Sequence, residues 1–351
     1  MRVVAAVAVI ILHVGAACVT KYGDVSAGRW WAGNIMDSAT RWVVPVFVML
    51  SGFLLLDPSK AAEPIASFYR KRAWRVGIPL IFWSIFYWYV WPPLWHGSGF
   101  PSVVSAARAF VLGSPFWHLD YLFIIIGVYI FTPVLRKLVS RLEPAELRFT
   151  IIVALLLAMG NSLLQTYFGT TREGGAPSYN AFSQFVPYLA YYLAGFYLGS
   201  KRLTRSQLAI VALLCVLAAT ATAAITSITV PIFGASGFGF VAYSTFSPTV
   251  VIMSLCVFLF IANTCNSGHG ASAIIRWVAP STLGVYLIHP VFLDVGGRFG
   301  ITVSSLPVYL CWLPIVGVTV ASFVVAGLLR RIPYVSAVVG EKTSHLKVSA
   351  Y

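Results

Sequence analysis

Residues 2–20 read RVVAAVAVIILHVGAACVT, an apolar run that opens with Arg2 and carries a single imidazole, that of His13. A run of about 20 apolar residues forms a helix long enough to cross the hydrocarbon core of a bilayer. The run therefore predicts that residues 3–20 form a transmembrane helix.

Similar runs recur along the whole chain. They cover residues 42–56, 73–94, 117–139, 149–168, 182–199, 208–226, 246–262, 279–295 and 307–329. Their number favours a retained first helix over a cleaved signal peptide. Lipid offers no hydrogen-bond partners to the backbone, so each run must be helical. We expect an all-α polytopic membrane bundle of about ten helices. It forms a single domain over residues 1–332, and residues 333–351 form a polar tail.

The composition supports this prediction. Of 351 residues, 59% are apolar and 10% are charged, whereas a soluble domain carries roughly 25% charged residues. A soluble, disordered or disulfide-stapled protein is therefore excluded. The five cysteines form no CxxC pair and indicate neither a disulfide framework nor a metal site; they are Cys18, Cys215, Cys256, Cys265 and Cys311.

Basic residues outnumber acidic ones by 24 to 10, giving a net charge of +14. Nucleic-acid binding would require these charges on one solvated face, but they lie in short loops between apolar runs. With ten spans and a cytoplasmic N-terminus, 18 basic residues fall on the cytoplasmic side and 6 on the other. This asymmetry predicts that both termini are cytoplasmic.

Polar groups inside the apolar runs are costly, so they point to function. His13 follows Arg2 by eleven residues, about three helical turns, which places both side chains on one face about 16.5 Å apart. Each alone has a simpler explanation: a hydrogen bond to a neighbouring helix for His13 and a topological anchor for Arg2. In the ninth run, Tyr286 and His289 share a face, and Pro290 frees a backbone carbonyl. Together these features favour a polar cavity.

A cationic cluster precedes the third run and consists of Arg70, Lys71, Arg72 and Arg75. Arginine's planar fork suits bidentate recognition of phosphate. The alternative is contact with lipid headgroups.

Two further sites are less specific. His118 opens the fourth run beside Asp120, where both are either functional or simply hydrated at the interface. Ser51 and Gly52 lie within the second run and are typical of close helix packing.

Several motifs recur in a fixed order: Arg2 with His13, VPVFVMLSGFL at 44–54, FYRKR at 68–72 leading to IPL at 78–80, WHL at 117–119 followed by Tyr129 and Pro133, YLAG at 192–195 leading to Gly199, and YLIHP at 286–290. In this order they resemble the acyltransferase 3 family of integral-membrane O-acyltransferases. The similarity is to its stand-alone, ten-helix members.

The resemblance implies transfer of an acyl group, most simply acetyl, from cytoplasmic acyl-CoA to a hydroxyl of a surface or lipid-linked glycan. It also implies a multi-pass protein of a bacterial cytoplasmic membrane. Acyl-CoA, the glycan and membrane lipids would be its partners, with no metal and no nucleic acid; the oligomeric state stays open.

The same resemblance assigns roles to residues. His13 acts as the general base with the help of Arg2, and Arg70, Lys71, Arg72 and Arg75 bind the CoA phosphates. Ser51, His118, Tyr286 and His289 contact the substrates, and Ser51, Tyr286 and His289 are the possible donors to the oxyanion. An acyl-histidine intermediate stays open.

Two other classes of protein remain as alternatives. A secondary transporter or lipid-linked sugar flippase also uses broken helices and buried polar groups. A structural partner of a polysaccharide export complex, gated by acyl-CoA, would have no chemistry of its own. Proton-coupled transporters usually bury carboxylates, and no Asp or Glu lies centrally in a predicted span, which favours the enzyme.

Overall fold

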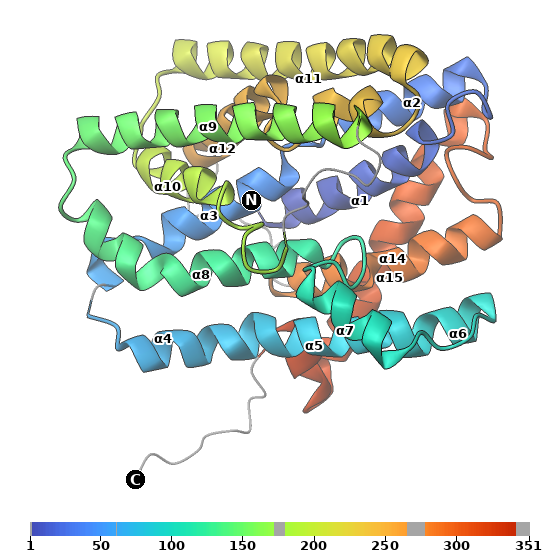
Figure 1. Ribbon diagram of the computed structural model, residues 1–351, viewed down its shortest axis with the longest axis horizontal. Helices are drawn as coiled ribbons and strands as arrows, with labels where there is room; N and C mark the ends of the chain where they lie inside the picture. The colour runs from blue at the N-terminus through green and yellow to red at the C-terminus, as the bar shows by residue number, and fades with distance from the viewer. Residues whose placement is uncertain (1, 61, 172–179, 265–277, 342–351) are drawn as a thin grey trace.

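The computed structural model describes residues 2–60, 62–171, 180–264 and 278–341. Within these ranges every regular element is a helix, as predicted (Figure 1). Five residues used in the sequence predictions lie outside the described ranges: Arg172, Cys265, Arg276, Lys342 and Lys347.

By length and composition, seven stretches among the described residues are able to cross a membrane. Four are α1 (Arg2–Val19), α8 (Asp120–Val139), α9 (Pro144–Thr171) and α11 (Arg205–Phe233). Three join two elements each: α2 (Ala27–Ser38) with α3 (Val43–Leu55), η4 (Gly237–Tyr243) with α12 (Pro248–Thr264), and η6 (Val308–Leu310) with α15 (Trp312–Arg331). In Figure 1 α8, α9 and α11 lie along the long axis of the molecule.

The other three predicted spans are shorter or interrupted. The run at 73–94 falls in a helical stretch made of α4 (Ile65–Arg72), η2 (Ala73–Gly77), α5 (Ile78–Ile85), η3 (Phe86–Val90) and α6 (Trp91–His96), in which η2 and η3 are π-helical. The runs at 182–199 and 279–295 hold α10 (Tyr188–Gly199), η5 (Ala279–Ser281) and α14 (Thr282–Arg298). The count of ten spans and the side of the termini stay predictions. The remaining elements are η1 (Pro58–Lys60), α7 (Val103–Val111) and η7 (Val335–Val339).

The second span differs from its predicted bounds. It begins at Ala27 instead of residue 42 and is broken at residues 39–42. Pro45 has no N–H for the carbonyl of Arg41 and is tolerated only in the first turn of a helix, so α2 cannot continue smoothly into α3.

The polar residues of α2 hid this helix from the hydropathy pattern. They are satisfied inside the bundle: Asn34 donates from Nδ2 to the carbonyl of Ala223 at 3.0 Å and accepts from the hydroxyl of Tyr243 at 2.6 Å. Asp37, also on α2, is 1% exposed. Asp37 therefore lies in the observed span Ala27–Leu55, although no predicted span contained it.

Close packing between α3 and α10 rests on two glycines. A methyl group on Gly52 would overlap the backbone carbonyl of Tyr192, and one on Gly195 would overlap that of Met49. Each glycine thus lets the backbone of the facing helix come into contact, as small residues do in other membrane helix pairs. This contact fixes the segment that carries Ser51.

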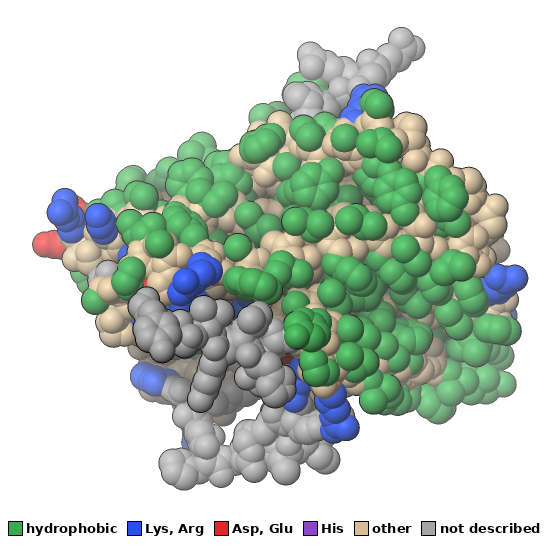
Figure 2. Space-filling model, turned by 90° about the horizontal axis from the view of Figure 1, so that it is seen from below, with side chains coloured by type: hydrophobic (Ala, Val, Ile, Leu, Met, Phe, Trp, Pro, Cys, Tyr) green, Lys and Arg blue, Asp and Glu red, His purple; other side chains and the backbone are tan. Residues whose placement is uncertain are grey.

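The exterior is apolar, as a lipid-facing surface requires. Figure 2 shows hydrophobic side chains over most of one face, with Lys and Arg toward its edges. Large exposed apolar residues include Leu157 on α9, Ile228 on α11 and Val320 on α15. We conclude that the chain is a multi-pass membrane protein.

Replacing Gly52 or Gly195 by Ala should destabilise the protein by about 1–3 kcal/mol, because the added methyl overpacks the contact between α3 and α10. The control is Gly160→Ala on α9, where a Cβ would meet nothing within 4 Å. Thermal unfolding in detergent, followed by tryptophan fluorescence, measures both. Equal melting temperatures for Gly52→Ala, Gly195→Ala and Gly160→Ala would show that the contact is not tight.

Candidate active site

Three histidines from separate segments meet inside the bundle. The ring of His13, on α1, stacks on that of His289, on α14, with centroids 5.3 Å apart and planes inclined by 19°. His118 lies just before α8, and its ring centroid is 5.5 Å from that of His289. Trp117 closes the cluster, with its ring 4.4 Å from that of His13. The histidines predicted as site residues are therefore neighbours.

Burial differs among the three rings. His289 is fully buried and His118 is 2% exposed, so His118 is not a hydrated interface residue. His13 is partly exposed. Its ring packs against the other imidazole and an indole, and it is the least buried of the three histidines.

Hydrogen bonds already occupy the donor groups of two of the candidate oxyanion donors, His289 and Tyr286. Nδ1 of His289 lies 2.6 Å from the carbonyl of Tyr286. A carbonyl only accepts, so Nδ1 carries the proton and Nε2 of the neutral ring presents a lone pair. The hydroxyl of Tyr286 donates to the carbonyl of His118. Both donors are thus already engaged, whereas Nε2 of His289 has no partner among the described residues.

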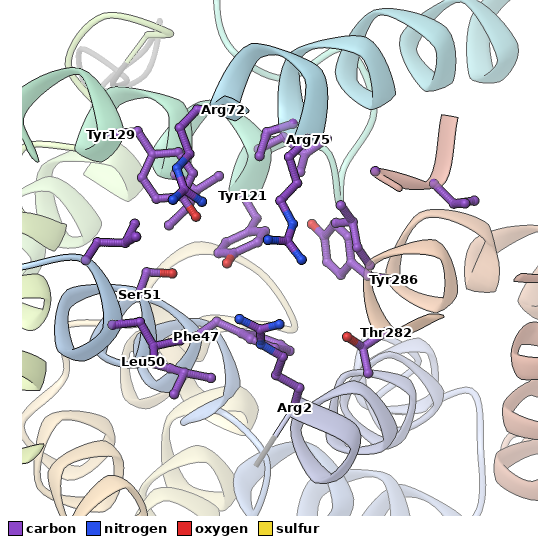
Figure 3. A pocket seen from close by; sticks show the side chains of 18 of the residues that line it. Arg2, Phe47, Leu50, Ser51, Arg72, Arg75, Tyr121, Tyr129, Thr282 and Tyr286 are labelled. Atoms are coloured by element: carbon purple, nitrogen blue, oxygen red, sulfur yellow. The ribbon is translucent and has the colours of Figure 1, made fainter. Parts of the chain in front are cut away.

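A cavity of about 140 Å³ lies near the N-terminal end of α1. We call it the arginine cavity. Its lining includes Arg2, Ser51, Arg72, Arg75, Tyr121, Tyr129, Thr282, Tyr286 and Glu341. Figure 3 shows Arg2 and Arg75 pointing toward one another across the space, with Arg72 beside Tyr129. Guanidinium groups that converge in this way form a site for an anion.

Only part of the predicted cationic cluster reaches this cavity. Arg72 and Arg75 lie three residues apart on the face of the helix that turns inward, whereas Arg70 is exposed on another face. Lys71 instead pairs with Glu63, with Nζ 2.9 Å from Oε1. The four cations are close in sequence, but only Arg72 and Arg75 line the cavity.

The arginine cavity also contains residues that the sequence reasoning missed. Tyr121 and Tyr129 lie eight residues apart on α8 and line the same wall. Their spacing with Ile125, also in the lining, is i, i+4, i+8, which is one helical stripe. Arg72 places its guanidinium 5.3 Å from the ring centroid of Tyr129. The folded part of the C-terminal tail adds Val339 and Gly340.

Tyr286 links the arginine cavity to the histidines. It lines the cavity, and its ring centroid lies 5.5 Å from that of His118 and 6.0 Å from that of His289. One side chain thus separates the anion site from the imidazoles. The arginine cavity and the histidine cluster are therefore adjacent, with Tyr286 between them.

Residues 1–331 match the family model described as an acyltransferase domain. The chain belongs to the acyltransferase 3 family. Membership makes it a membrane acyltransferase and confirms the resemblance inferred from the motifs. No match was found among curated proteins or among solved structures.

In this acyltransferase, Glu63 holds the loop before α4 in place. Glu63 accepts from Lys71 and from Arg136, whose Nη2 lies 3.3 Å from Oε2. Arg136 is 5% exposed and also donates to the backbone carbonyls of Leu55 and Lys60. The hydrogen bond from Lys71, with a smaller effect of Arg136, holds the pKa of the Glu63 carboxyl below its usual value. These contacts fix the helix that carries Arg72.

Glu63→Gln should lower the free energy of unfolding by about 1 kcal/mol at neutral pH, because it removes a partly screened charge pair. A carboxyl with a lowered pKa stabilises the fold above its unfolded pKa, and this stabilisation disappears as the pH falls through the folded value. The difference from wild type should therefore shrink as the pH falls below about 4.3, the usual pKa of a Glu carboxyl. Melting temperatures measured from pH 7 to pH 3 test this, and a difference independent of pH would contradict it.

Proposed function

We propose that this acyltransferase moves an acyl group, most simply acetyl, from cytoplasmic acyl-CoA to a hydroxyl of a surface or lipid-linked glycan. The observation that carries the proposal is the single face of α1 that bears Arg2 in an anion site and His13 in a histidine cluster. The chain would lie in the cytoplasmic membrane of a bacterium with both termini inside.

The arginine cavity suits the donor. Acyl-CoA carries a pyrophosphate and a ribose phosphate, and Arg2, Arg72 and Arg75 offer guanidinium groups that bind such oxygens bidentately. The rise from Arg2 to His13 is about 16.5 Å, comparable to the pantetheine arm. Once Tyr286 moves aside, the thioester would extend toward the imidazoles.

The histidine cluster suits the chemistry. A neutral imidazole of His13 would take the proton from the glycan hydroxyl while that oxygen attacks the thioester carbonyl. The new carbon–oxygen bond forms, the carbon–sulfur bond breaks, and the CoA thiolate leaves with the proton returned by the imidazolium. The neighbouring ring of His289 presents Nε2 toward the interior, so it would share the proton as a second base.

The second candidate is a transporter or flippase for a lipid-linked sugar. The buried Asp37, in a broken span, is the kind of group that transporters use. Its carboxylate is, however, already paired with Arg41 at 2.5 Å. The measurement of acyl transfer below distinguishes the two functions.

His13→Ala should abolish labelling of glycan when membranes are supplied with labelled acetyl-CoA, because no group replaces the base. A loss of about 100-fold or more is expected for a general base. His96→Ala is the control, since the ring of His96 is exposed at the far end of α6. Equal labelling by His13→Ala and His96→Ala would remove His13 from the mechanism. No labelling by wild type would favour the transporter.

The double variant Arg72→Gln/Arg75→Gln should weaken acetyl-CoA binding by about 10- to 100-fold, since each charge-assisted hydrogen bond contributes about 1.5–3 kcal/mol. The matched control is Arg70→Gln/Lys137→Gln, which removes the same charge from exposed positions outside the cavity. Titration of acetyl-CoA into protein in nanodiscs measures both. Equal affinities for the two variants would assign the cluster to lipid contact.

A further inference from the structure

A second cavity, of about 320 Å³, lies at the other end of α1. We call it the Asp37 cavity. Its lining consists of Ala16, Val19, Thr20, Asp37, Arg41, Thr166, Gly237, Phe240, Tyr243 and Ser244. We propose that it binds an uncharged carbohydrate and presents the acceptor hydroxyl to His13. The presentation to His13 rests on the proposed acyl transfer, but the binding of a sugar does not.

The position of the Asp37 cavity relative to His13 supports this role. Ala16 and Thr20 follow His13 by three and seven residues, so they continue its face of α1 toward the C-terminal end. Ala16 lies only about 4.5 Å further along the axis. Along α1, the imidazole of His13 thus lies between the arginine cavity and the Asp37 cavity. A base that acts on a donor bound at one end and an acceptor bound at the other requires this position.

Two broken spans meet at the Asp37 cavity. Asp37 lies in the last turn of α2 and Arg41 within the break at residues 39–42, and Tyr243 and Ser244 stand at the break between η4 and α12. A hydrogen bond from Nη1 of Arg41 to the carbonyl of Tyr243, at 3.4 Å, joins them. Irregular backbone at membrane depth is tolerated only where it is buried in protein or lines a water-filled cavity.

The polar groups of the Asp37 cavity have unused hydrogen-bonding capacity. Asp37 is 1% exposed, and only its Oδ2 is paired, with Arg41. Oδ1 of Asp37 and Nε of Arg41 are buried without a partner among the described residues. An unpaired acceptor and an unpaired donor on two residues of one lining match a sugar hydroxyl, which both donates and accepts.

The charge of the Asp37 cavity selects among ligands. The carboxylate of Asp37 neutralises the guanidinium of Arg41, so the pair offers no net charge to a phosphate. An aromatic wall adds apolar surface, because the rings of Phe240 and Tyr243 stack with centroids 5.6 Å apart. A few polar groups beside aromatic rings, in a volume above about 300 Å³, are typical of small-molecule sites. These features favour a neutral sugar over a lipid phosphate.

The test is direct binding of methyl glycosides of neutral hexoses and N-acetylhexosamines to the full chain in nanodiscs without acyl-CoA. Saturation-transfer difference NMR detects millimolar affinities, and glycerol 1-phosphate serves as the charged comparator. We expect saturable binding of at least one glycoside. Absence of binding by the whole panel, or tighter binding of glycerol 1-phosphate, would overturn the proposal.

Two variants locate the binding. Ala16→Phe adds bulk to the lining of the Asp37 cavity, and Asp37→Asn removes the charge of the acceptor; each should weaken glycoside binding at least tenfold. Ala17→Phe is the control, because Ala17 is exposed and absent from the lining. Unchanged acetyl-CoA affinity in Ala16→Phe shows an intact fold. Full glycoside binding by Ala16→Phe would overturn the assignment, whereas sugar binding without acyl transfer in wild type would contradict only the enzymatic function.

Discussion

The structure depends on one constraint: lipid solvates neither charges nor backbone polar groups, so each polar group in the apolar slab must find its partner in the protein. Along α1 this produces a stripe in which Arg2, His13 and Ala16 face inward toward polar neighbours. Helices such as α9 and α11 turn their apolar side chains outward instead. Function is therefore concentrated along one helix face.

Broken helices lie around this stripe of α1. Pro45 lies in the first turn of α3 and Pro248 begins α12, so each span is interrupted one turn earlier. The π-helical turn η2 changes the rotation of the helix that carries Arg72 and Arg75. Each irregularity costs backbone hydrogen bonds, and each borders a cavity. Membrane proteins commonly keep such breaks where a ligand is held.

The sequence predicted what depends on long apolar runs: an all-helical membrane fold, Arg2 and His13 on one face, and the family. The prediction from sequence failed where polar residues form hydrogen bonds or ion pairs with other segments of the fold. Asn34 and Asp37 kept α2 out of the predicted runs, although Ala223 and Tyr243 bond to Asn34 and Arg41 pairs with one oxygen of Asp37. It also treated four adjacent cations as one site, because only the packing of α4 shows which face turns inward. The gathering of His118 with His13 and His289 required tertiary contacts.

The central claim is that His13 meets the reactive end of a nucleotide thioester held by the arginine cavity. An experimental structure of the chain in nanodiscs with a non-hydrolysable acetyl-CoA analogue tests it most directly. The account predicts phosphates between Arg2, Arg72 and Arg75, Tyr286 displaced, and the acyl carbon about 3–4 Å from where a hydroxyl bound to His13 would lie. Phosphates bound elsewhere, or an acyl group separated from the imidazole by Tyr286 in its present position, would contradict it.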